Sequence, residues 1–152
     1  MYDVNLLLGA EAAELRKLYI NTFIETKCDY YKCNIEQCDL YPDGSYYVGY
    51  LWDCIRNRSI ISAYQCEDYL QKIRGYIYVF WDLHSSHHIL IPDYWKYPRS
   101  AVLRLNVATF FNIQHQLPED IYVFDESLSW TISFTHEETK SGCRMCFIAH
   151  RT

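Results

Sequence analysis

The spacing of apolar residues changes at Gly75, and this change constrains the fold more than any other feature of the chain. Before Gly75, apolar residues recur every three or four positions, which is typical of one face of an α-helix. After it, β-branched and aromatic residues form short runs that are typical of β-strands. Helices followed by strands predict an α+β fold. We expect N-terminal helices packed on one face of a mostly antiparallel sheet of about five strands.

Three helices are expected before Gly75. The first covers residues 11–25, and the second begins near Ser45. The third has the clearest local signal, because Ser62 and Gln65 form an S-x-x-Q capping box and Gly75 stands where the helix should stop.

The strands are expected after Gly75, over residues 76–81, 88–91, 121–125, 129–135 and 144–149. Residues 101–105 fit either a strand or the start of a helix, and both interpretations stay open. Asn106 is expected to cap a short helix that Pro118 ends.

The length of the chain sets its domain organisation. With 152 residues and no internal repeat or linker, it is expected to form a single domain over residues 1–152. No apolar run approaches the roughly 18 residues that a membrane-spanning helix needs. The N-terminal residues lack the positive charge of a signal peptide. We therefore expect a soluble, cytoplasmic protein with reduced cysteines and no membrane partner.

Charge is unevenly distributed along the chain. The formal net charge is −5, and residues 1–70 carry 11 acidic and 6 basic side chains, which accounts for all of it. An acidic protein lacks the basic surface that nucleic acids and anionic membranes need, so neither is expected as a partner. The acidic half is either an ordinary solubilising surface or a face that attracts a basic partner.

One group of residues has the composition of a zinc site, with the spacing H-x6-C-x2-C-x3-H: His136, Cys143, Cys146 and His150. Alternate residues of a strand point to opposite faces, and Cys143 and Cys146 are therefore expected on different sides of the last strand. Reduced thiols are the favoured interpretation, so no metal or cofactor is predicted, and a structural zinc site stays open as an alternative.

A second group of candidate ligands, His84, His87 and His88, follows Asp82 in a polar turn. A carboxylate can orient an imidazole for acid–base chemistry or metal binding. A small metal-dependent hydrolase that uses this loop is therefore the alternative function, although histidines in a polar turn are more often simply solvated.

No catalytic motif accompanies these groups. The sequence has no G-x-S-x-G nucleophile turn, and its five glycines form no phosphate-binding loop. Four carboxylates flank one expected strand, but they occupy turns and are expected to face water: Glu119, Asp120, Asp125 and Glu126. We therefore do not predict an enzyme.

The segment from Leu117 to Glu137 contains the pattern I-Y-V-F-D-x-x-x-x-W-x-x-x-F-T-H-E. It resembles the C-terminal hairpin of bacterial immunity proteins from polymorphic toxin and contact-dependent growth inhibition systems. The resemblance implies a non-enzymatic cytoplasmic protein that binds and neutralises one cognate toxin domain. The acidic charge of this chain favours a basic toxin, such as a nuclease.

The expected toxin contacts lie in an acidic, tyrosine-rich segment, because tyrosine gives large contact area and carboxylates attract a basic partner. A second edge of the interface is expected at the end of the hairpin. The expected contact residues are Asp29, Tyr31, Glu36, Asp39, Asp43 and Tyr46 in the first group and His136 and Glu137 in the second.

Overall fold

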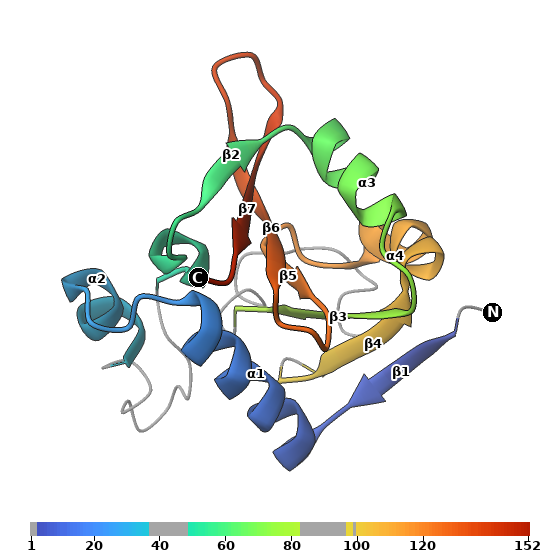
Figure 1. Ribbon diagram of the computed structural model, residues 1–152, viewed down its shortest axis with the longest axis horizontal. Coiled ribbons are helices and arrows are strands. Elements are labelled where there is room, and N and C mark those ends of the chain that lie inside the picture. The colour runs from blue at the N-terminus through green and yellow to red at the C-terminus, as the bar shows by residue number, and fades with distance from the viewer. Residues whose placement is uncertain (1–2, 37–48, 83–96, 99) are drawn as a thin grey trace.

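The computed structural model of the protein describes residues 3–36, 49–82, 97–98 and 100–152 (Figure 1). In this part of the chain, seven strands form one sheet in the order β1-β4-β3-β5-β6-β7-β2, and every neighbouring pair is antiparallel. The strands are β1 (Val4–Leu7), β2 (Ser59–Ile61), β3 (Tyr76–Trp81), β4 (Val102–Asn106), β5 (Ile121–Phe124), β6 (Trp130–Glu138) and β7 (Arg144–His150). The α+β class is confirmed.

The expectation of about five strands is wrong, because the described residues form seven. The strands that were missed, β1 and β2, have four and three residues and lie at the two edges of the sheet. A strand this short has too few positions to show a period. Residues 101–105, which fitted two interpretations, lie mostly within β4, and the strand expected over residues 88–91 lies outside the described residues.

The helical segments are α1 (Gly9–Phe23), α2 (Asp29–Tyr31), the π-helix η1 (Lys32–Glu36), the 3-10 helix η3 (Leu51–Cys54), α3 (Ala63–Gln71), α4 (Val107–Ile113) and the 3-10 turn η6 (Gln114–Gln116). The capping box is confirmed, since the Ser62 hydroxyl accepts the Gln65 amide at 3.1 Å and the Gln65 side chain accepts the Ser62 amide at 2.9 Å. Asn106 caps α4 as expected and accepts the Thr109 amide at 2.8 Å. Within the described residues, the second expected helix is present only as the short 3-10 helix η3. Its predicted start at Ser45 lies outside those residues.

The helices cover both faces of the sheet, whereas we expected them on one face. Tyr19 of α1 packs with Phe80 and Tyr122 on one face, while Leu70 of α3 belongs to a separate core with Val79 on the other. Strands β3 and β5 are apolar at consecutive positions, and consecutive side chains point to opposite faces. Both faces therefore need a helical cover to exclude water.

Side chains from the sheet hold η3 in place. The amide of Leu51 donates to Asp82 Oδ1 at 3.1 Å, and the amide of Trp52 donates to the Tyr122 hydroxyl at 3.0 Å. The Tyr122 hydroxyl in turn donates to Asp82 Oδ2 at 2.6 Å. The first amides of a helix have no partner within the helix. In η3 a buried carboxylate and a buried phenol supply partners, which fixes the helix against the sheet.

Burial of Cys54 and Tyr19 predicts a loss of stability at alkaline pH. Burial raises the pKa of the Cys54 thiol from 9.0 to about 12, and it also raises the pKa of the Tyr19 phenol. A raised pKa stabilises the folded state fully below the unfolded pKa, and this stabilisation is lost as the pH rises towards the folded value. We expect the urea midpoint of the reduced protein to fall between pH 9 and pH 12. This fall should be shallower in Cys54→Ala, whereas replacing the exposed Cys33 by alanine should leave its slope unchanged.

None of the helices in the described part of the chain is both long enough and apolar enough to cross a membrane.

Candidate functional site

A buried carboxylate orients an exposed imidazole where β5 and β6 lie side by side. His136 Nδ1 lies 2.9 Å from Asp120 Oδ1 and 3.1 Å from Oδ2, and the His136 amide donates to Oδ1 at 3.0 Å. The Asp120 side chain is 9% exposed, whereas that of His136 is 39% exposed. The imidazole of His136 is therefore exposed to solvent, and the buried Asp120 carboxylate fixes its orientation.

Aromatic rings complete this site. Trp52 donates its indole N–H to Asp120 Oδ1 at 3.1 Å. The Tyr50 ring stacks on that of Trp52, with centroids 5.3 Å apart, and lies 5.1 Å from the His136 ring. Trp52 also stacks on Phe147 of β7, with centroids 5.9 Å apart. We call Tyr50, Trp52, Asp120 and His136 the His136 site.

The backbone explains why these residues meet. Asp120 immediately precedes β5, and Trp52 lies in η3, which the Asp82–Tyr122 pair fixes against the sheet. The register between β6 and β7 shifts between Phe134 and Glu138, which is where His136 lies. Such an irregularity interrupts the strict alternation of side chains along a strand and redirects them.

The chemistry of the His136 site follows from its hydrogen bonds. A carboxylate only accepts hydrogen bonds, so the neutral imidazole carries its proton on Nδ1 and keeps Nε2 as an acceptor. The protonated imidazole would instead donate from Nε2. Burial, followed by the negative charges of Asp120 and Asp82, raises the pKa of the Tyr50 phenol to about 12, which keeps this hydroxyl neutral at physiological pH.

A small hollow of about 160 Å³ lies beside His136 and is lined by Glu119, Thr135, His136, Glu138 and Arg144. Arg144 donates to the backbone carbonyls of Thr135, at 2.9 Å, and of Glu119. The three neighbouring carboxylates, Glu119, Glu137 and Glu138, are all exposed. The imidazole therefore stands among exposed negative charges, with one guanidinium group bound to the backbone.

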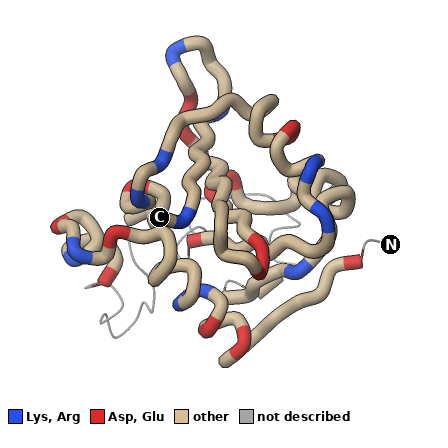
Figure 2. Tube along the Cα trace, in the orientation of Figure 1, with Lys and Arg blue, Asp and Glu red and all other residues tan. Residues whose placement is uncertain are grey.

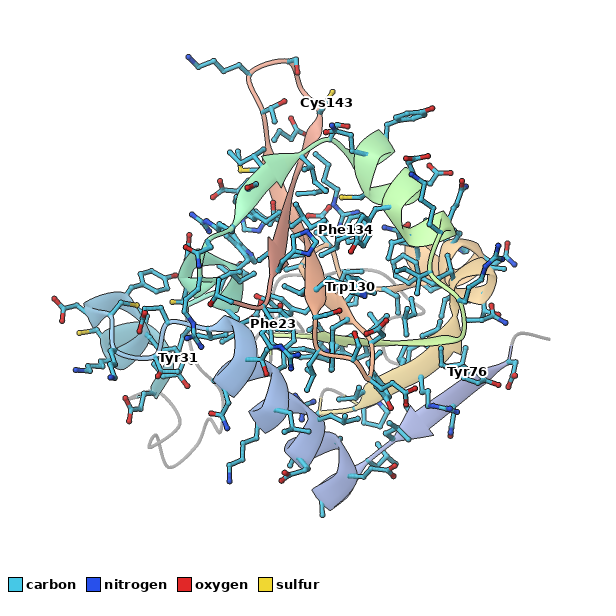
Figure 3. The ribbon with its side chains drawn as sticks, viewed as in Figure 1. Phe23, Tyr31, Tyr76, Trp130, Phe134 and Cys143 are labelled. Atoms are coloured by element: carbon cyan, nitrogen blue, oxygen red, sulfur yellow. The ribbon has the colours of Figure 1, made fainter. Side chains whose placement is uncertain are left out.

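The expected contact residues are only partly described. His136 and Glu137 are both exposed. On α2 and η1, Asp29 and Glu36 are exposed. Tyr31 of α2, which Figure 3 labels, is half-buried. Three expected contacts lie outside the described residues: Asp39, Asp43 and Tyr46. Side chains of both signs lie along α1, where Glu11 and Glu14 are followed by Arg16 and Lys17, and α2 carries Asp29 (Figure 2).

The two groups of expected contacts are connected through Tyr30 and Tyr50. The Tyr30 hydroxyl accepts the Tyr50 amide at 3.2 Å, and the Tyr50 ring contacts His136. Gly49 allows this close approach, because a Cβ at that position would lie 2.9 Å from the Tyr30 hydroxyl and 2.9 Å from Asn34 Cβ. The segment that contains Asp29 is therefore in contact with the His136 site through Tyr30.

The four residues of the zinc alternative do not converge on a common centre in the structure. Cys146 is fully buried beside Cys66 of α3, whereas Cys143 is exposed at the start of β7 (Figure 3). His150 lies by the Tyr69 ring at 6.2 Å, and His136 lies by Trp52. No group of three or more His, Cys, Asp or Glu side chains within the described ranges is placed to hold a metal ion. The histidines of the hydrolase alternative, His84, His87 and His88, lie outside those ranges.

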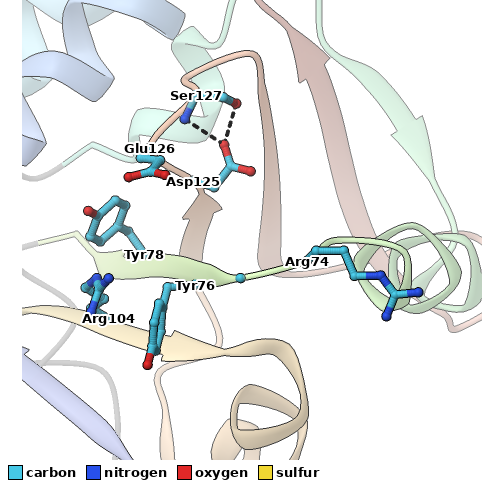
Figure 4. A pocket seen from close by; sticks show the side chains of 8 residues that line it. Arg74, Tyr76, Tyr78, Arg104, Asp125, Glu126 and Ser127 are labelled. Carbon is cyan, nitrogen blue, oxygen red and sulfur yellow. Dashed lines mark hydrogen bonds between the residues drawn. The ribbon is translucent and has the colours of Figure 1, made fainter.

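A second hollow, of about 240 Å³, lies at the other end of the sheet and includes Arg74, Tyr76, Tyr78, Arg104, Asp125 and Glu126 (Figure 4). The Arg104 guanidinium lies 3.8 Å from the centre of the Tyr76 ring. Asp125 is already bound by the Ser127 amide and by the Trp130 indole at 3.0 Å. The mixed charges of this hollow favour neither an anion nor a cation.

Sequence reasoning missed the central residue of the site. Asp120 was expected to face water as a turn carboxylate, and it is instead buried under His136 and Trp52. Of the other three carboxylates in that group, Glu119 and Glu126 are exposed and Asp125 is half-buried. The adjacent His136 was identified as a contact, but nothing in the spacing links it to Asp120 or Trp52.

Comparison with protein-family models, with curated proteins and with solved structures finds no match for this chain.

Proposed function

We propose that the protein is an immunity protein that binds a cognate toxin domain and uses the His136 site as part of the contact surface. The observation that carries this proposal is the exposed, preoriented imidazole of His136, which lines one hollow with Glu119 and Glu138. The resemblance of residues 117–137 to immunity proteins supports the same class, and His136 lies within that segment.

The local physics suits binding to a protein. A side chain that is already held in one orientation loses little conformational entropy when it binds. Aromatic residues such as Tyr50 are frequent contributors to binding energy at protein interfaces. The carboxylates around His136 would attract a basic surface and accelerate its association.

The proposed partner is therefore a basic toxin domain, for example a nuclease whose active cleft normally binds a polyanion. An acidic inhibitor that covers such a cleft competes with the substrate on electrostatic grounds. The proposed place of action is the cytoplasm, and the proposal requires no catalysis, cofactor or metal. The alternative hydrolase would use histidines outside the described residues, and the proposal does not depend on them.

Charge reversal next to His136 tests the proposal. In the double variant Glu137→Lys/Glu138→Lys, association with the toxin domain encoded by the neighbouring gene should slow by about tenfold, and its salt dependence should flatten. Stopped-flow measurements at low and high salt would give both quantities. The matched control is Glu11→Lys/Glu14→Lys, which makes the same change of charge on exposed positions of α1.

Equal association rates for the two double variants would remove the His136 site from the interface. Absence of any complex between the wild-type protein and that toxin domain would contradict the immunity function itself.

A further inference from the structure

Two cysteine side chains from distant parts of the chain are in contact at the junction of α2 and η3. Cys28 Sγ lies 3.8 Å from Cys54 Sγ. Cys28 is half-buried, and Cys54 is 3% exposed within the core that α1 and η3 share. The pair therefore has one sulfur that solvent reaches and one that it does not.

The backbone holds this pair in register. The Glu25 amide donates to the Cys54 carbonyl at 2.7 Å, and the Arg56 amide donates to the Phe23 carbonyl at 2.8 Å. Between these bonds, Ile24 and Ile55 form an antiparallel bridge. The two sulfurs consequently meet through fixed backbone pairing and not through the chance overlap of two mobile side chains.

Closing the pair requires a small side-chain movement. A disulfide needs its sulfurs about 2.05 Å apart, so the present contact must shorten by roughly 1.8 Å, which is within the reach of a χ1 rotation. Cys28 is the N-cap residue of α2. Its sulfur accepts a hydrogen bond from the Tyr31 amide at 3.4 Å, and its S–H donates to the Glu25 carbonyl at 3.1 Å. These contacts already hold the thiol close to Cys54.

We propose that Cys28 and Cys54 are an oxidisable thiol pair that forms a disulfide in the presence of a hydroperoxide. The bond closes a ring around residues 29–53 and links α2 covalently to η3. This inference concerns a modification site and does not depend on the identity of the partner.

The reaction balances with the hydroperoxide as the only oxidant. The Cys28 thiolate attacks the nearer peroxide oxygen, the O–O bond breaks, and the departing alkoxide takes a proton to leave as an alcohol, or as water when the oxidant is hydrogen peroxide. The Cys54 sulfur then attacks the sulfenic sulfur of Cys28, the S–O bond breaks, and the leaving hydroxide takes the Cys54 proton to form water. Two thiols are oxidised by two electrons, and one hydroperoxide is reduced.

The roles of the two cysteines follow from their surroundings. Burial raises the pKa of Cys54 to about 12, so it stays protonated and acts second, while the half-buried Cys28 meets the oxidant first. The described chain holds another thiol pair, Cys66 and Cys146, but both of these residues are fully buried. These two thiols contact each other, but neither is exposed to an oxidant in solution.

The test uses the reduced 152-residue protein and hydrogen peroxide at neutral pH, followed by denaturation, alkylation of the remaining thiols and peptide mass mapping. We expect two of the seven cysteines to become protected from alkylation and a linked peptide that contains Cys28 and Cys54. Dithiothreitol should restore both thiols. Exposed Cys33 and Cys143 provide the internal control, since neither should join the linked peptide.

Single variants separate the two steps. In Cys54→Ser, a sulfenic-acid trap such as dimedone should label Cys28, because no second thiol resolves the intermediate. In Cys28→Ser, Cys54 should stay reduced, and this variant changes only a half-buried position, so it tests the proposal even if Cys54→Ser fails to fold. A linked peptide that joins Cys28 to any other cysteine, or a Cys54 that is oxidised without Cys28, would overturn the proposal.

Discussion

Replacing Trp52 by alanine should lower the free energy of unfolding by about 4 kcal/mol, since removing a buried Trp or Phe side chain costs roughly 3–5 kcal/mol. Trp52 is 4% exposed, and its ring stacks on Phe147 and Tyr50. The variant also removes an indole donor from the buried carboxylate of Asp120. Equilibrium urea unfolding monitored by circular dichroism would measure the loss.

The variant Trp52→Phe separates packing from hydrogen bonding. It keeps an aromatic ring in contact with Phe147 and Tyr50 and removes the N–H that binds Asp120. We expect it to cost about 2 kcal/mol, the scale of one hydrogen bond to a charged group together with a small loss of packing. Equal costs for the two variants would mean that the ring stack contributes little to stability.

Replacing Tyr122 by phenylalanine should lower the free energy of unfolding by about 3 kcal/mol, although only one oxygen atom is removed. The hydroxyl donates to the buried Asp82 carboxylate at 2.6 Å and accepts the Trp52 amide at 3.0 Å. A buried polar group that loses its partner costs roughly 1–3 kcal/mol, and more when it is charged. Both the amide and the carboxylate lose a partner in this variant, and the first turn of η3 should loosen.

The matched control is Tyr78→Phe on the neighbouring strand. Tyr78 is half-buried, and its hydroxyl makes no hydrogen bond within the described residues, so its removal should change stability by less than about 0.5 kcal/mol. Hydrogen exchange of the Leu51 and Trp52 amides should accelerate in Tyr122→Phe and not in Tyr78→Phe. A similar loss in the two variants would contradict the proposed role of the Asp82–Tyr122 pair.

Local signals in the sequence predicted those parts of the fold in which short-range physics decides the structure. The capping box at Ser62 and the cap at Asn106 depend only on residues three positions away, and both are present. The strands β3, β5, β6 and β7 were expected close to their observed bounds, because runs of β-branched and aromatic residues indicate a strand locally, even in the four residues of β5.

The layer arrangement could not be obtained in the same way. The strand β3 is apolar at consecutive positions and buried on both faces, but such a run does not say which helix covers which face. Helix α1 covers one face and α3 the other, and this choice depends on how the sheet orders its strands. The edge strands β1 and β2 exist because β4 and β7 offer them backbone partners, and no local pattern records those partners.

The candidate site, too, was predictable from the sequence only in part. The sequence by itself marked His136 and Glu137 and determined an acidic, α+β chain without a recognisable catalytic motif. Only the tertiary structure decided that Asp120 is buried, and that Trp52 and His136, 84 positions apart in the chain, both bind its carboxylate. The physical reason is that a hydrogen bond depends on distance in space. Turn residues reveal their burial only when a distant segment, here η3, packs over them.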